Sequence, residues 1–309
     1  MTWDKPFDDV AAEQFLASSA AMGRAFYGIP GKRVGETVLQ AVVDTRRVVG
    51  SNTNLGIILL LSPLAGAAVG GNYEGLRERL AVTLRSLTEM DTEEIYRAIR
   101  IAAPGGLGDS RKYDVKDPSP QIAILEAMAE AASWDSVARE YVTDFEITFT
   151  VGLPAFEGCS VKDIPLKDAV TQTFLTILSR FPDTLIARKR GMKEAKIVSS
   201  NAERVLRSDA VGSGRWRDAV LEFDLSLRDR DNTLNPGTKA AVSYTHLRAH
   251  ETVLELVCRL LLEKKKAFEL LNAYIHLEVV MRTSDPLIIY KFITDFLHIF
   301  TRICIRKLR

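Results

Sequence analysis

Residues 55–70 read LGIILLLSPLAGAAVG, an apolar stretch without a charged side chain. The stretch is too short to span a bilayer, which takes about 20 apolar residues, and Pro63 interrupts it. It lacks the alternation of apolar and polar residues that is typical of a half-buried strand. We therefore expect a core helix here that is buried on all sides, with other helices packed around it.

Helical patterns continue on both sides of this stretch. Apolar residues repeat at helical spacing in 38–43 and in 122–132, and the Ala-rich segment 11–26 favours helix by propensity. The sequence FEITFTV at 145–151 is the one candidate strand, and it can equally be the end of a helix. We expect an all-α fold, namely a single multi-helix domain followed by an extraneous helical tail.

Composition and charge exclude several functions. The chain has 309 residues, 26% of them charged, and its net charge of +1 gives no basic surface for nucleic-acid binding. All four histidines lie in 246–298, so catalysis in the residues before them cannot use imidazole. The three cysteines form no CxxC pair, and the first ten residues lack the features of a signal peptide. We expect a cytoplasmic protein with no membrane partner and no structural zinc.

Four loop-like clusters interrupt the helices, and two of them lie in the first half of the chain. The first, Asn52-Thr53-Asn54-Leu55-Gly56, either caps the following helix or offers the free N–H groups of its first turn to a phosphate. The second is APGGLG at 103–108, with Asp114 close behind. Its glycines form either a plain turn or a nest of N–H groups that binds an anion.

The other two clusters combine carboxylates with cations. In DTLIARKRG at 183–191, Asp183 precedes Arg188 and Lys189; the group either binds a magnesium–polyphosphate or forms a solvated basic face of a helix. In FDLSLRDRDNTLNPG at 223–237, Asp224 and Arg228 stand four residues apart. They either pair along a helix or point into a charged pocket.

In order and approximate spacing, the four clusters together resemble those of the triphosphoribosyl-dephospho-CoA synthase family, over about residues 10 to 238. The resemblance is to the branch with Asn-Thr-Asn-Leu-Gly where other members have Asn-Thr-x-Lys-Gly. It implies an all-α cytoplasmic enzyme that transfers the triphosphoribosyl group of ATP to the 2′-hydroxyl of 3′-dephospho-CoA and releases adenine. The product is the precursor of the prosthetic group of citrate lyase or malonate decarboxylase acyl carrier proteins.

The resemblance also implies roles for individual residues. Cleavage of the N-glycosidic bond passes through an oxocarbenium-like state, which carboxylates stabilise without imidazole. Asp183 and Asp224 are the predicted catalytic residues, as general base or as ligands of the Mg²⁺ expected from ATP use. The predicted substrate-binding residues are Asn52, Thr53, Asn54, Gly105, Gly106, Gly108, Asp114, Arg188, Lys189, Arg228, Asn235 and Gly237.

The chain departs from this family at both ends. A Pro-Lys-Pro-Gly-like segment expected before the first helix is not found in the opening MTWDKPFDD, so we expect a truncated start. After NPGT at 235–238 the family continues with Thr-Ala-Asp-Leu and a closing apolar helix. This chain instead reads Lys-Ala-Ala-Val, which places Ala241 where the family has its acid. We expect the closing helix to be lost.

Residues 242–266 resemble a translated sequencing adapter, and 267–309 carry no recognisable motif. This resemblance accounts for His246 and His250, four residues apart, without a metal site. The expected parts are therefore an incomplete synthase-like domain over 1–241, an adapter-like segment and an unassigned helical tail. We expect this truncated chain to be inactive as a transferase. The alternative function is a nucleotide-binding or pathway protein of C1-cofactor metabolism that lacks this reaction.

Overall fold

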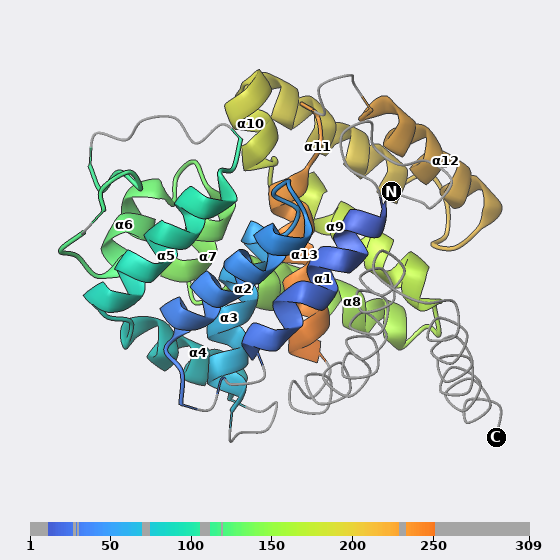
Figure 1. Cartoon of the computed structure of the whole chain (residues 1–309). Coiled ribbons are helices and arrows are strands. Elements are labelled where there is room, and N and C mark those ends of the chain that lie inside the picture. The colour runs from blue at the N-terminus through green and yellow to red at the C-terminus, as the bar shows by residue number, and fades with distance from the viewer. Residues whose placement is uncertain are drawn as a thin grey trace, which may run out of the picture. The chain divides into compact units, whose positions relative to one another are not determined.

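The structure is a computed structural model that describes residues 12–26, 29, 31–69, 75–105, 112–118, 120–228 and 233–250. The chain divides into two compact units, 1–257 and 258–309, and every described residue lies in the first. Within the described residues every regular element is a helix, which confirms the all-α prediction (Figure 1). The predicted tail at 267–309 lies outside the described residues.

The helices follow one another along the chain. The first half of the described chain contains α1 (Ala12–Phe26), α2 (Val34–Val48), α3 (Leu55–Ala68), α4 (Leu76–Arg85), α5 (Glu89–Ala102), α6 (Ile124–Ala131) and α7 (Ser136–Val142). The second half contains the π-helical turn η1 (Thr148–Gly152), α8 (Leu153–Ser160), α9 (Leu166–Arg180), α10 (Thr184–Arg190), α11 (Met192–Leu206), α12 (Gly214–Ser226) and α13 (Gly237–His250).

Helix α3 is the core helix that the apolar stretch predicted, with Leu60 and Leu64 completely buried. Pro63 stands inside this helix and has no N–H to donate to the carbonyl of Leu59. The hydroxyl of Tyr141, from α7, donates to that carbonyl at 2.7 Å. The bond that proline removes is thus replaced by a side chain from a neighbouring helix. No helix of the described chain is long and apolar enough to cross a membrane.

The candidate strand FEITFTV is not a strand: after a bend at Phe145, residues 146–151 begin a helical run, whereas the sequence had offered the end of a helix as the alternative. The chain reverses at Asp144 and Phe145, which both have positive φ angles of 51° and 57°. The carboxylate of Glu140 then accepts bonds from the backbone N–H of Ile147 at 2.8 Å and of Thr148 at 3.0 Å. Glu140 is fully buried, so this carboxylate caps the next helical run from inside the protein.

Helix α13 lies among the other helices and packs against α3, α7, α8, α9, α10 and η1 (Figure 1, orange). Ala241, Val242 and Thr245 are buried in these contacts. The expected loss of a closing helix is therefore wrong for residues 237–250. The helix runs through the domain boundary predicted at 241, while the adapter origin of 242–266 stays a prediction and its residues beyond 250 lie outside the described part.

A second core cluster joins α9 to α12. Trp216 from α12 is 1% exposed and packs with Leu178 of α9, Ile186 of α10 and Ala195 of α11. Through Ile186 this cluster fixes α10, the helix that carries the basic residues of the third sequence cluster. The two cores together therefore determine where these cations lie relative to α3 and α13.

Candidate functional site

The fold brings the four sequence clusters together in pairs. A Cβ atom built on Gly56 would lie 2.9 Å from the Cβ of Ala241, so the first cluster contacts α13. A Cβ built on Gly105 would lie 3.8 Å from Cε of Lys189, which joins the second cluster to the third. A Cβ built on Gly237 would lie 3.1 Å from Leu185, which joins the third to the fourth. Parts of clusters separated by many residues in sequence are thus adjacent, and the fourth cluster takes part through Gly237.

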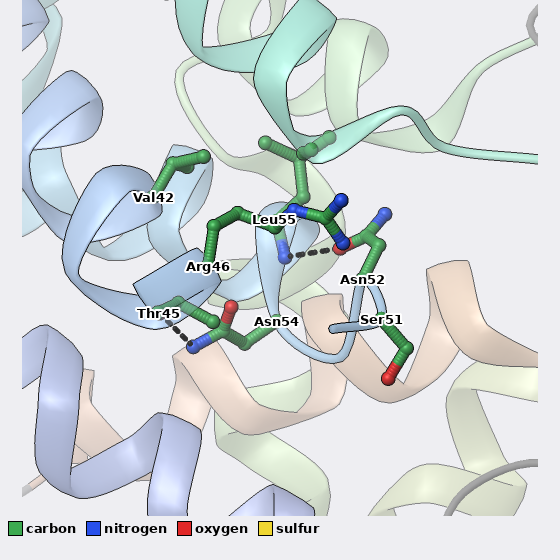
Figure 2. Close-up of a pocket in the computed structure, with 8 residues that line it drawn as sticks. Val42, Thr45, Arg46, Ser51, Asn52, Asn54 and Leu55 are labelled. Atoms are coloured by element: carbon green, nitrogen blue, oxygen red, sulfur yellow. Dashed lines mark hydrogen bonds between the residues drawn. The ribbon is translucent and has the colours of Figure 1, made fainter. Parts of the chain in front are cut away.

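The Asn-Thr-Asn-Leu-Gly loop is held by its own side chains. Asn52 Oδ1 accepts the N–H of Leu55 at 3.2 Å and so caps the start of α3 (Figure 2). Asn54 is buried, and its Nδ2 donates to Thr45 Oγ1 of α2 at 3.2 Å. Thr53 Oγ1 donates to Ser18 Oγ of α1 at 2.8 Å. The capping alternative is confirmed for Asn52, and the phosphate-binding role of all three residues stays a prediction.

A small cavity of about 10 Å³ opens beside this loop and has room for about one water molecule. It is lined by Val42, Thr45, Arg46, Ser51, Asn52, Asn54, Leu55 and Ala102 (Figure 2). This lining includes the cation of Arg46, and no carboxylate of the described chain takes part in it. Ser51 Oγ is buried and has no hydrogen-bond partner among the described residues. The lining therefore offers polar donors and one positive charge, but the cavity itself is too small for a phosphate group.

Arg46 is a candidate that the sequence reasoning missed. It stands in α2, six residues before the loop, where an arginine looks like part of a solvated helix face. Its guanidinium donates to the carbonyl of Gly50 and lines the cavity with Asn52. The signal that would have found it is a cation near the end of a helix that leads into a candidate phosphate loop.

The second cluster follows α5 through a tight turn. Ala103 ends the helix with a φ of 47°, in the left-handed region, and Gly105 beyond it is exposed. Gly106 and Gly108 lie outside the described residues, so the predicted anion nest stays a prediction. Asp114 Oδ1 accepts the N–H of Lys116 at 2.8 Å, which makes a local turn, and its substrate-binding role stays a prediction as well.

Asp183 is completely buried and caps two helices at once. Its Oδ1 accepts the N–H of Leu185 at 2.8 Å and of Ile186 at 3.0 Å, in the first turn of α10. Its Oδ2 accepts the N–H of Lys239 at 2.8 Å, in the first turn of α13. Burial raises the pKa of Asp183, while these N–H donors and the Lys239 ammonium oppose the rise. The contacts give Asp183 a structural role, and its catalytic role stays a prediction.

The cations of α10 lie where the second cluster can reach them. Arg188 forms an ion pair with Asp135, the residue that caps α7 by accepting the N–H groups of Val137 and Ala138. Lys189 lies beside Gly105, as described above. Arg188, Lys189 and Arg190 are all exposed, so the basic face of α10 is solvated, while Arg188 and Lys189 also contact other elements.

In the fourth cluster, Asp224 and Arg228 pair with each other along the helix, which was one of the two interpretations of the sequence. Arg228 donates to Asp224 Oδ2 from Nε at 3.1 Å and from an Nη atom at 2.7 Å. Both side chains are half-buried. Farther along, Gly237 donates its N–H to the carbonyl of Asn235 at 2.9 Å as α13 begins. Substrate contacts of Arg228, Asn235 and Gly237, and catalysis by Asp224, stay predictions.

The described residues hold no group of three or more His, Cys, Asp or Glu side chains that could bind a metal ion. Both oxygens of Asp183 accept backbone N–H groups, and Arg228 occupies one oxygen of Asp224. These two carboxylates therefore do not form a ready ligand set for Mg²⁺ in this arrangement. The predicted magnesium site at Asp183 and Asp224 remains without support from the geometry.

Comparison with known proteins agrees with the resemblance that the clusters suggested. The family model of ATP:dephospho-CoA triphosphoribosyl transferase matches residues 2–252, a range that extends beyond the predicted one at both ends. The crystal structure of an Archaeoglobus fulgidus protein assigned as a triphosphoribosyl-dephospho-CoA synthase superposes with a TM-score of 0.61 and 26% sequence identity. The match covers 76% of this chain and 96% of that one. No curated protein matches the sequence. The chain therefore belongs to the ATP:dephospho-CoA triphosphoribosyl transferase family.

Proposed function

We propose that this chain binds ATP through the cations beside its two glycine-containing loops and transfers the triphosphoribosyl group to 3′-dephospho-CoA. The inactivity expected from the sequence rested in part on the loss of a closing helix, and the formation of α13 removes that ground. The proposal rests on two contacts: Lys189 lies beside Gly105, and Gly56 packs against Ala241 of α13. A triphosphate needs several cations and N–H donors within one region. Arg46, Arg188 and Lys189 are our candidates for these cations.

The proposed reaction breaks the bond between C1′ of the ATP ribose and N9 of adenine. The 2′-oxygen of dephospho-CoA forms the new bond to C1′, and its proton leaves with adenine. Asp224 is our candidate for the base that takes this proton, because its carboxylate is partly accessible whereas Asp183 is completely buried. Asp183 then contributes by fixing the first turns of α10 and α13.

Magnesium belongs to the proposal as a companion of ATP. Mg²⁺ in nucleotide sites is commonly held by phosphate oxygens, water and one or two carboxylates, so a dedicated protein cage is not required. It would neutralise part of the phosphate charge. Because ATP is an intracellular metabolite, the cytoplasm is the proposed compartment.

Adenine release tests this function directly. The chain is incubated with ATP and magnesium, with and without dephospho-CoA, and adenine is measured by chromatography. We expect release only when both substrates are present, and a loss of about tenfold or more in ATP affinity for Arg46→Gln and Arg188→Gln. Arg204→Gln on α11 is the control, because Arg204 is exposed and belongs to none of the clusters. Adenine formed equally without dephospho-CoA would show hydrolysis and contradict the proposed transfer.

A second function, nucleotide binding without transfer, is favoured by one observation. Ala241 stands where the family is expected to carry an acid, and its Cβ lies against Gly56 in the first cluster. A missing carboxylate at this position would leave ATP binding intact and slow the chemistry. Calorimetric binding of ATP, combined with no adenine release in the presence of dephospho-CoA, would establish this second function. Restoration of release by Ala241→Asp would identify the cause.

A further inference from the structure

Three helices begin at one point inside the protein. Ser136 is the first residue of α7, Thr184 is the first of α10, and Lys239 is the third of α13. The backbone N–H of Ser136 donates to Thr184 Oγ1 at 3.2 Å, and the backbone N–H of Lys239 donates to Asp183 Oδ2 at 2.8 Å. We name Ser136, Asp183, Thr184 and Lys239 the three-helix junction.

The side chain of Lys239 completes the three-helix junction. It is 1% exposed, although lysine is almost never fully buried in proteins. Its Nζ donates to Ser136 Oγ and lies 5.7 Å from the centre of the Phe181 ring. The contacts form a closed path from α13 to α7 through the ammonium group, from α7 to α10 through Thr184, and back to α13 through Asp183.

The charges around the ammonium explain how it is tolerated. The buried carboxylates of Asp183 and Glu140, and the carboxylate of Asp135, favour its charged form, while Arg139 opposes it. Burial is nevertheless the largest effect and lowers the pKa of Lys239 to about 8. A group whose charged form is disfavoured in the fold is not a net source of stability at neutral pH. We therefore assign the role of Lys239 to the contact that its ammonium makes with Ser136.

The path continues to the proposed phosphate-binding cations. Asp135 directly precedes Ser136 and forms the ion pair with Arg188 of α10. A shift of the first turn of α7 would therefore move the partner of Arg188. We propose that Lys239 is a positioning residue of the substrate site: by holding Ser136 it fixes Asp135, and through Asp135 it fixes Arg188. This inference rests on the proposed function for the meaning of Arg188.

Lys239→Met is the main test, because it keeps the long apolar stem and removes only the ammonium. Ser136→Ala removes the hydroxyl that Lys239 contacts and leaves the lysine in place, so it still decides the matter if Lys239→Met fails to fold. Lys193→Met, at an exposed lysine of α11, is the matched control. The three variants and the unchanged chain are compared by thermal unfolding, by amide hydrogen exchange and by calorimetric titration with ATP.

We expect Lys239→Met and Ser136→Ala to weaken ATP binding by a similar factor, about tenfold. The double variant should be no weaker than either single one, because both changes break the same contact. Exchange should accelerate in both variants at the N–H groups of Val137 and Ala138, which Asp135 accepts. The midpoint of unfolding should be unchanged or higher in Lys239→Met, whereas Ser136→Ala leaves a buried ammonium without its acceptor and should lower it. The control should match the unchanged chain in all three measurements.

Two results would overturn the inference. One is unchanged exchange at Val137 and Ala138 in both variants, which would show that the ammonium does not hold α7. The other is a lowered unfolding midpoint with unchanged ATP affinity, which would show a purely structural lysine. If the unchanged chain binds no ATP, the proposed function fails, and the exchange data still decide whether Lys239 holds the first turn of α7.

Discussion

Replacement of Tyr141 with phenylalanine is expected to lower the free energy of unfolding by about 1–3 kcal/mol, the cost of an unsatisfied buried polar group. The hydroxyl of Tyr141 donates at 2.7 Å to the carbonyl of Leu59, and Tyr141 and Leu59 are 1% and 5% exposed. The usual helical donor to this carbonyl is missing, because Pro63 stands four residues later and lacks an N–H. Water cannot easily replace a donor at this depth.

The reasoning is tested by restoring the missing donor. In Pro63→Ala the new N–H can reach the Leu59 carbonyl, so Tyr141→Phe should cost less than half as much in that background. Tyr96→Phe is the control, because Tyr96 donates at 2.6 Å to the carbonyl of Tyr113, which is exposed and can turn to water. Urea unfolding followed by circular dichroism gives the free energies of unfolding of the unchanged chain, of the three single variants and of the double variant. An equal cost of Tyr141→Phe with and without Pro63 would refute the explanation.

Three further predictions follow from other contacts. The pKa of Lys239 is lowered from 10.5 to about 8, so the unfolded chain holds this proton to higher pH than the folded one. The free energy of unfolding of the unchanged chain should therefore rise relative to that of Lys239→Met as pH increases from 8 to 10.5. Urea unfolding at several pH values measures this difference, and parallel pH profiles of the two chains would contradict the prediction. Glu140→Gln should lower the free energy of unfolding by about 1–3 kcal/mol, because an amide NH₂ would face backbone N–H donors. Glu146→Gln, at an exposed ion pair, should lower it by under about 1 kcal/mol. Equal losses in the midpoint of thermal unfolding would argue against capping by a buried carboxylate. Gly56→Ala should lower the free energy of unfolding by about 1–3 kcal/mol, because the new Cβ is forced against Ala241. Adding Ala241→Gly should restore the lost stability. If it does not, α13 does not pack on the first cluster.

The sequence predicted the elements whose composition alone decides their structure. The stretch 55–70 is apolar on all sides, so only a buried helix can satisfy it, and α3 has that position. The loop 52–56 had two interpretations that use the same N–H groups, and only coordinates could show that Asn52 caps Leu55. Asp224 and Arg228 posed the same problem, and the structure pairs them. Local patterns predicted where chemistry could lie but could not choose between capping and binding.

The roles of Asp183 and Arg46 depend on residues distant in sequence. Asp183 was predicted as a carboxylate that acts with the nearby cations Arg188 and Lys189, but its Oδ2 accepts the N–H of Lys239, 56 residues later. No local pattern contains that partner. Arg46 was overlooked because a charged residue in a helix is usually solvated, and its neighbourhood becomes visible only when the loop folds back beside α2. Long-range contacts between elements are therefore what the sequence reasoning lacked.

The position of α13 shows why departure from the family's sequence was the wrong guide to the end of this domain. Its first turns read GTKAAVSY, where the family continues with Thr-Ala-Asp-Leu and an apolar helix, and this departure led us to expect no closing helix. A helix that passes between six other elements needs small side chains before it needs apolar ones, because its backbone must approach theirs closely. Ala241 against Gly56 is such an approach. The long side chain of Lys239 is accommodated by Asp183 and Ser136, so the position of this helix depends on side-chain size and on charge compensation.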